Sequence, residues 1–198
     1  MLNYADIAPK KKFFIFELDG VLYPERDFYL QIYYLFANFI EYVETVPPAT
    51  DLTNFMKTVY EHHGPEVVFD RAVGAFGLDV KYRENLDRLL LTAQLPFKLE
   101  LHPPVLSLLQ ELVLDRKQIF IWTKGNPEGQ LNKIRQVEWK GLGQYLRVFF
   151  ADEYESLTAV LSENQLSTAE VLFIGSASLT EAQQLGLDVL SVADFMDC

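Results

Sequence analysis

The stretch that decides the fold of this chain is FFIFELDGVLYP, at residues 13–24. Four bulky apolar residues run directly into Glu17 and Asp19, which are followed by Gly20. An apolar run without polar alternation is typical of a strand with both faces buried, as in a parallel sheet covered by helices. In such sheets, ligands bind beyond the carboxyl ends of the strands. We therefore predict a buried first strand whose end contributes two acids to a functional site.

Four more short apolar runs have the same character. They are rich in Phe, Ile, Val or Leu and lie at residues 118–123, 147–151, 171–175 and 188–192. Helical patterns separate the later runs, and the one at residues 126–139 opens with a cap residue followed by proline. Strands that alternate with helices imply right-handed crossovers and an open sheet. The pattern predicts an α/β fold built on a parallel sheet.

The region after the first strand breaks this alternation. It shows four helical patterns and no strand, with Asp51 placed to cap the second helix. The expected helices span residues 28–43, 51–60, 66–76 and 81–93. We predict an α/β core formed by residues 1–24 and 96–198, and an inserted all-α helical cap formed by residues 25–95.

Composition narrows the class of partner. The chain has 198 residues and a formal net charge of −11, which disfavours contact with nucleic-acid phosphates or an anionic membrane surface. A small anionic ligand stays open, because a local site can oppose the overall field. No stretch approaches the roughly 18 apolar residues of a membrane helix. The single cysteine, Cys198, allows no internal disulfide, so we expect a cytoplasmic protein. The sequence identifies no protein partner.

Three motifs carry a resemblance to a known family. FELDGVLYP at residues 16–24 resembles the first motif of the haloacid dehalogenase (HAD) superfamily, apolar residues followed by D-x-D-G. IWTKGNP at residues 121–127 is similar to the second motif, an apolar strand that ends in Thr or Ser. VLFIGSASLTEAQQLGLDVL at residues 171–190 is similar to the fourth motif, G-D-S-x-x-D followed by a helix and A-G. The resemblance implies a HAD-like Rossmannoid three-layer core with the α-helical cap of small-molecule phosphatases and nucleotidases.

The resemblance also implies Mg²⁺-dependent phosphoryl transfer through an aspartyl phosphate. Glu17 occupies the position of the attacking aspartate, and Asp19 matches the general acid and base. Thr123 matches the hydroxyl that holds the phosphate, and Lys124 and Gly125 follow it as further ligand-binding candidates. The metal ligands implied in this chain are Glu17, Asp19 and, in the fourth motif, Ser176.

Several positions depart from the family pattern. The extra methylene of Glu17 moves its carboxylate on by roughly 1.5 Å, although in-line attack requires placement within about 0.5 Å. Ser176 and Thr180 stand where the family has metal-binding acids, and Glu181 on the predicted helix is turned about 100° from Thr180. The lysine of the third motif, expected near residues 155–156, is missing. Asp152 and Glu153 are further candidates for an oxygen ligand.

Two functional hypotheses follow, and both stay open at this point. The first is a pseudoenzyme, a catalytically impaired relative of Mg²⁺-dependent small-molecule phosphatases that keeps a phosphate-sized crevice. The weakened ligand set disfavours Mg²⁺ as a cofactor, and no other cofactor is expected. The alternative is an active phosphomonoester phosphatase with altered metal dependence, in which Asp19 is the acid and base. In a purely structural interpretation, Glu17 is a strand-end acid bonded to backbone N–H groups and Asp19 caps a turn.

Overall fold

The computed structural model describes residues 11–151 and 157–196, which divide into two compact units. The first unit contains the described residues through Pro24, those of Leu99–Gln130 and those from Val137 onward. The second contains Glu25–Lys98 and Leu131–Gln136. The chain thus passes from the first unit to the second between residues 24 and 25 and returns between residues 98 and 99. Residues 131–136 also belong to the second unit. The division into core and cap at 24/25 and 95/96 stays a prediction about folding domains.

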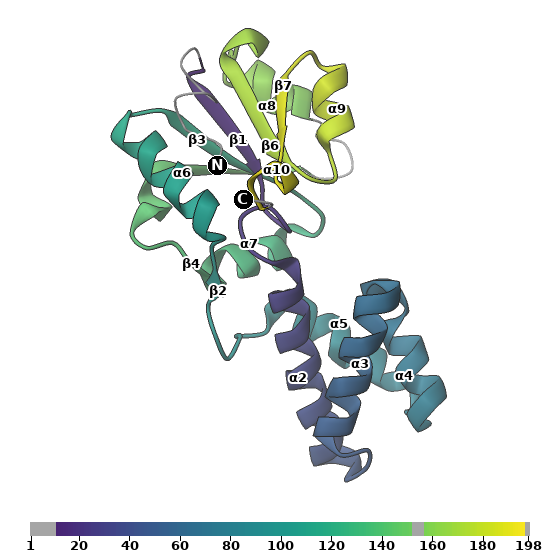
Figure 1. Ribbon diagram of the computed structural model, residues 1–198. Coiled ribbons are helices and arrows are strands. Elements are labelled where there is room, and N and C mark those ends of the chain that lie inside the picture. Colours follow the sequence, from purple (N-terminus) through teal and green to yellow (C-terminus); the bar gives the residue numbers. More distant parts are fainter. Residues whose placement is uncertain (1–10, 152–156, 197–198) are drawn as a thin grey trace. The chain divides into compact units, whose positions relative to one another are not determined.

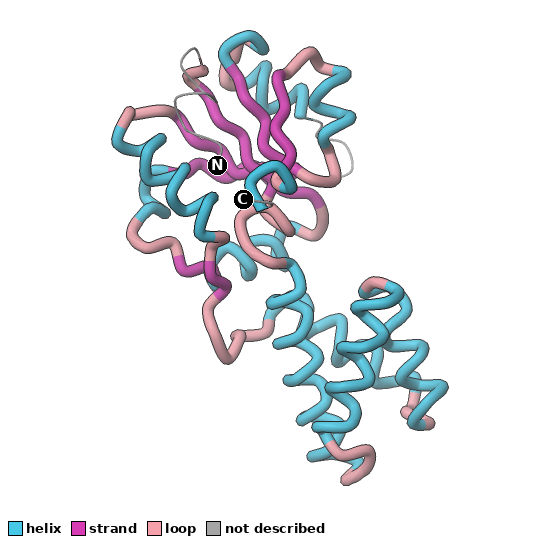
Figure 2. The backbone as a smooth tube through the Cα atoms, viewed as in Figure 1, coloured by secondary structure: helices cyan, strands magenta, loops and turns pink. Residues whose placement is uncertain are grey.

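A five-stranded parallel sheet forms the centre of the first unit (Figures 1 and 2). The strand order is β5-β3-β1-β6-β7, so the first strand of the chain lies in the middle. This arrangement confirms the predicted α/β fold. The strands are β1 (Phe13–Glu17), β3 (Gln118–Lys124), β5 (Leu146–Ala151), β6 (Val171–Gly175) and β7 (Asp188–Ser191).

Strand register brings three carboxyl ends to one edge of this sheet. Glu17 pairs with Trp122 of β3, and Phe16 pairs with Ile174 of β6. The chain continues from β1 to β3 on one side and later adds β6 on the other. β1 therefore lies at the switch point of the sheet, where α/β proteins place their ligands.

Helices cover both faces of the sheet (Figure 1). The buried cluster on one face joins Ile15, Phe120 and Phe173 of the sheet to side chains of α8 (Leu157–Glu163) and α9 (Leu179–Gln184). On the other face lies α6, with α10 near its end. The bounds of these two helices are Pro103–Leu114 and Ala193–Met196. Burial of the central strands β1, β3 and β6 on both faces explains why they are continuously apolar, whereas the edge strands β5 and β7 are only partly buried.

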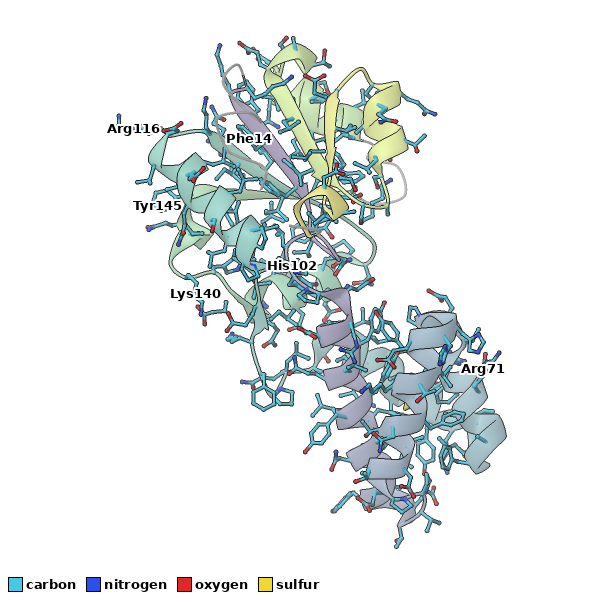
Figure 3. All side chains as sticks on the ribbon, in the orientation of Figure 1. Phe14, Arg71, His102, Arg116, Lys140 and Tyr145 are labelled. Carbon is cyan, nitrogen blue, oxygen red and sulfur yellow. The ribbon has the colours of Figure 1, made fainter. Side chains whose placement is uncertain are left out.

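The structure adds short elements that the sequence did not predict. A two-residue strand, β2 (Leu99–Glu100), pairs in parallel with β4 (Val137–Glu138). Helix α7 spans Pro127–Gln136 and stops before residue 139, because the chain turns extended to form β4. His102, labelled in Figure 3, directly precedes α6 and donates its backbone N–H to the carbonyl of Leu22. Two 3₁₀ turns complete the unit, η3 (Leu142–Tyr145) and η4 (Thr168–Glu170).

The second unit contains the four helices that were predicted. The sequence predicted that Asp51 caps the second of them, and this prediction is wrong. That helix begins earlier, at Ala49, with Pro48 at the cap position, so Asp51 lies in its first turn, where a carboxylate favours the helix dipole. The helices are α2 (Glu25–Glu44), α3 (Ala49–His63), α4 (Val68–Phe76), on which Figure 3 labels Arg71, and α5 (Arg83–Thr92), with 3₁₀ turns η1 (Pro65–Val67) and η2 (Val80–Tyr82).

Aromatic rings fill the interior of this helical unit. Phe28, Tyr33 and Phe36 of α2 are buried, as expected for a helix packed along one side. The rings of Tyr29 and Tyr60 each lie 6.1 Å from the ring of Tyr33. Burial, and then the neighbouring phenols, raise the pKa of Tyr33. The three buried rings of α2 thus belong to the core of the second unit, whereas Tyr34 and Tyr42 of the same helix are exposed. None of the helices in the described parts of the chain is long and apolar enough to cross a bilayer.

Candidate functional site

A cavity of about 150 Å³ lies at the carboxyl ends of β1 and β3, within the first unit. Glu17, Asp19, Thr123 and Lys124, which sequence motifs singled out, all line it. Gly125 and Ser176 are not among its described lining residues. The other lining residues are Leu18, Trp122, Ala177 and Ser178, so the loop after β6 closes the third side.

Glu17 is buried, with 7% of its surface exposed, and both of its carboxylate oxygens are hydrogen-bonded. Oε2 accepts from the backbone N–H groups of Ser176, at 2.6 Å, and Ala177, at 3.1 Å. Oε1 accepts from the backbone N–H of Ser178, at 2.9 Å. Bonds from N–H groups to a charged carboxylate are among the stronger hydrogen bonds in proteins. The end of β1 is thereby tied to the loop that follows β6.

Gly175, the last residue of β6, leaves room for this carboxylate. A Cβ atom at position 175 would lie 2.8 Å from Oε2 of Glu17 and 2.5 Å from Cε1 of Phe173. Both distances are shorter than van der Waals contact. Glycine is therefore required here by the close approach of two side chains, and not by backbone conformation.

Asp19 is oriented by two other side chains. Its Oδ1 accepts a hydrogen bond from the Tyr23 hydroxyl, at 2.6 Å, and its Oδ2 accepts one from Nε2 of Gln130, at 3.0 Å. The same amide nitrogen donates to the backbone carbonyl of Lys124, at 2.7 Å. Gln130, on α7, thus links the ends of β1 and β3 and holds the Asp19 carboxylate at the cavity wall.

Thr123 and Gly125 have different positions at the end of β3. Thr123 pairs with Phe150 of β5, is 4% exposed and lines the cavity. Gly125 has a φ of 110°, a left-handed conformation that favours glycine, and begins the turn into α7. The side chain of Asn126 caps that helix by accepting from the backbone N–H groups of Glu128 and Gly129.

Lys124 is the last residue of β3, so the strand is one residue longer than the predicted run at residues 118–123. The strand extends that far because Lys124 pairs with Ala151 of β5. Its ammonium bonds Oε2 of Glu181 at 2.5 Å and lies 4.6 Å from the ring of Trp122. The Lys124 side chain is half-exposed and that of Glu181 is 31% exposed, so water screens the pair.

These residues do not fit the Mg²⁺ site that the resemblance implies. Mg²⁺ takes near-octahedral oxygen ligands that include carboxylates. Both oxygens of Glu17 already accept backbone N–H groups, and Ser176 offers a hydroxyl where a carboxylate is needed. Within residues 11–151 and 157–196, no group of three or more His, Cys, Asp or Glu side chains is placed to hold a metal. Asp152, Glu153 and residues 155–156 lie outside the described residues.

Sequence reasoning did not find the partners of Asp19 and Lys124, which are Gln130 and Glu181. Gln130 lies one helical turn into α7 and carries no motif signal. Glu181 bonds to Lys124 and accepts from the backbone N–H of Leu157. The only hint in the sequence was that Glu181 directly follows Thr180, which stands where the family has a metal-binding acid.

This chain resembles known proteins in its three-dimensional structure. No protein-family model matches it, and the search of curated proteins gave no match. A haloacid dehalogenase-like family hydrolase from Xanthomonas campestris superposes with a TM-score of 0.57, at 16% identity, over 93% of this chain and 83% of that one. This chain has the HAD-like fold.

Two further HAD-like structures give a similar result. A Thermotoga maritima protein assigned as a beta-phosphoglucomutase has a TM-score of 0.60 at 16% identity, covering 90% of this chain and 83% of that one. The Bacillus subtilis protein YfnB, assigned as a HAD hydrolase and solved bound to magnesium, has a TM-score of 0.57 at 16% identity, covering 91% and 86%. At these identities the likeness establishes the HAD-like fold, whereas the chemistry depends on the site.

Proposed function

We propose that this chain is a pseudoenzyme of the HAD-like fold, related to Mg²⁺-dependent small-molecule phosphatases, that binds a small anionic ligand without turnover. The observation that carries the proposal is the state of the Glu17 carboxylate. Both of its oxygens accept backbone N–H groups of residues 176–178. An attacking oxygen needs a free lone pair aimed in line at phosphorus. Three of the roughly four lone-pair directions of the Glu17 carboxylate are occupied, and the bonds to the loop fix the orientation of the one that remains on Oε1.

The charges around the cavity support a small anion as the ligand. The Glu17 carboxylate is balanced by three N–H groups, and that of Asp19 accepts from Tyr23 and Gln130. Lys124 is the lining residue with a positive charge, and an exposed ion pair such as Lys124–Glu181 contributes only about 0.2–1 kcal/mol. Lys124 can therefore exchange Glu181 for a phosphate-like anion at low cost. The cavity is smaller than the roughly 300–1,000 Å³ of sites for drug-sized ligands, which favours a small group.

A phosphatase assay tests the absence of turnover. We expect the wild-type chain and Asp19→Asn to release phosphate from a panel of phosphomonoesters with Mg²⁺ at the same background rate. In an active enzyme, loss of the general acid and base would lower kcat about 100-fold or more. Clear turnover that Asp19→Asn abolishes would contradict the pseudoenzyme and support the active phosphatase with Asp19 as acid and base.

Phosphate binding tests the ligand class. We expect inorganic phosphate to shift the amide resonances of the cavity lining, and Lys124→Met to weaken that binding about tenfold, because the variant loses one charge-assisted contact. Lys140→Met is the matched control. Lys140, labelled in Figure 3, forms an exposed ion pair with Glu100 in the same unit, at 3.3 Å. Equal weakening by both variants, or no shift with the wild type, would argue against a phosphate-like ligand.

A further inference from the structure

We propose that Glu17 is a positioning residue that attaches the loop of residues 176–178 to the end of β1, so that this site keeps its structure without a divalent cation. In this chain the carboxylate binds backbone N–H groups at the place where the family resemblance implies a metal ion. The attachment of the loop and phosphatase turnover are measured separately, so either proposal can fail without the other.

The first support is the number of bonds that converge on one buried side chain. Three successive backbone N–H groups donate to Glu17, at 2.6, 3.1 and 2.9 Å, and the Ser176 hydroxyl lies 3.4 Å from Oε2. An ionised carboxylate has about four lone-pair directions, so little acceptor capacity is left for a cation. With one N–H bond on Oε1, Glu17 can offer Mg²⁺ at most one ligand direction without breaking a bond to the loop.

The second support is the length of the side chain. An aspartate at position 17 would end one methylene earlier, and the three acceptor distances would grow by about 1 Å or more. Separations beyond about 3.5 Å are not hydrogen bonds. The additional methylene that moves Glu17 away from the nucleophile position is therefore the one that lets it reach the loop.

The third support is the space kept for the carboxylate. Gly175 precedes the loop directly, and any Cβ there would lie 2.8 Å from Oε2 of Glu17. Gly175 pairs with Ser191 of β7, and its carbonyl accepts from the backbone N–H of Val192, which directly follows β7, so its own backbone is held. The absence of a side chain at Gly175 and the N–H groups of residues 176–178 thus form a space that the Glu17 carboxylate fills.

Thermal unfolding followed by tryptophan fluorescence tests this role. We expect the wild-type midpoint to be the same in EDTA and in millimolar Mg²⁺. Glu17→Gln and Glu17→Asp are each expected to lower it by about 5 °C or more, because each loses at least one buried bond. The matched control is Glu170→Gln, whose carboxylate pairs with the exposed Lys12 in the same unit and whose loss is expected to shift the midpoint by less than about 2 °C.

Two further measurements locate the effect at the loop. Amide exchange at Ala177 and Ser178 is expected to be faster in Glu17→Gln while that of β6 is unchanged. Acetate matches the group removed in Glu17→Ala, so it is expected to raise the midpoint of that variant more than chloride of equal ionic strength. If Glu17→Ala does not fold, the unfolding midpoint and amide exchange of Glu17→Gln test the proposal. A wild-type midpoint that rises with Mg²⁺, or a Glu17→Gln variant with unchanged midpoint and exchange, would overturn the proposal.

Discussion

Phe173→Ala is expected to lower the free energy of unfolding of the first unit by about 3–5 kcal/mol, the usual cost of removing a buried aromatic ring. Phe173 is fully buried in β6, between β1 and β7, and its ring packs edge-on against Trp122 with centroids 5.9 Å apart. The loss combines the transfer of the ring from water with the cavity that the rigid sheet leaves behind. Both neighbouring strands are paired, which limits how far they can collapse into that space.

Urea unfolding followed by tryptophan fluorescence measures this loss. Both tryptophans, Trp122 and Trp139, belong to the first unit, so the signal reports that unit. Leu114→Ala is the control, because Leu114 ends α6 in the same unit and is 80% exposed. Its effect is expected to be within about 0.5 kcal/mol. A Phe173→Ala cost below about 1 kcal/mol would show that the ring is not part of the core.

Gly175→Ala is expected to cost about 3 kcal/mol, although it adds only one methyl group. The new Cβ would lie 2.5 Å from Cε1 of Phe173 and 2.8 Å from Oε2 of Glu17. Relief requires movement of a packed ring or of a carboxylate held by the loop. The same unfolding experiment measures the cost. Gly143→Ala is the matched control, since its Cβ would make an ordinary 3.5 Å contact with Trp139 in the same unit.

Combining the two substitutions identifies the source of the strain. Phe173→Ala removes the nearest atom to the new methyl group, so Gly175→Ala is expected to cost about 1 kcal/mol less in that background. The part of the cost that remains belongs to Glu17. Strictly additive costs would show that the ring is not what excludes a side chain at position 175. A Gly175→Ala cost as small as that of Gly143→Ala would contradict the close approach of Glu17.

The sheet could be predicted because its signal is local. Each of the five apolar runs is long enough to form a strand and too apolar to face water, so strand positions followed from the residues themselves. The β2–β4 pair could not be predicted, because two residues per strand carry no periodicity and the pairing joins positions far apart in the chain. The start of α3 was misplaced because Asp51 has the character of a cap residue but lies within the first turn.

The candidate site was only partly predictable, for a related reason. Asp19 and Thr123 follow from the motifs, since parallel strands place their carboxyl ends at one edge. The partners of these side chains do not follow, because a hydrogen bond depends on which atoms the packed fold brings within reach. Gln130 bonds to Asp19 from 111 positions away, and Glu181 bonds to Lys124 from 57 positions away.

The amino-acid sequence by itself determined that this chain forms a HAD-like α/β sheet and that acids stand where its first strand ends. Sequence alone left Glu17 either a displaced nucleophile or a strand-end acid bonded to backbone N–H groups. The contacts of its carboxylate follow only from the tertiary structure, because the N–H groups that donate to it belong to Ser176, Ala177 and Ser178, about 160 positions along the chain. They meet the carboxylate because β1 and β6 are neighbours in the sheet and Gly175 leaves the space between them open.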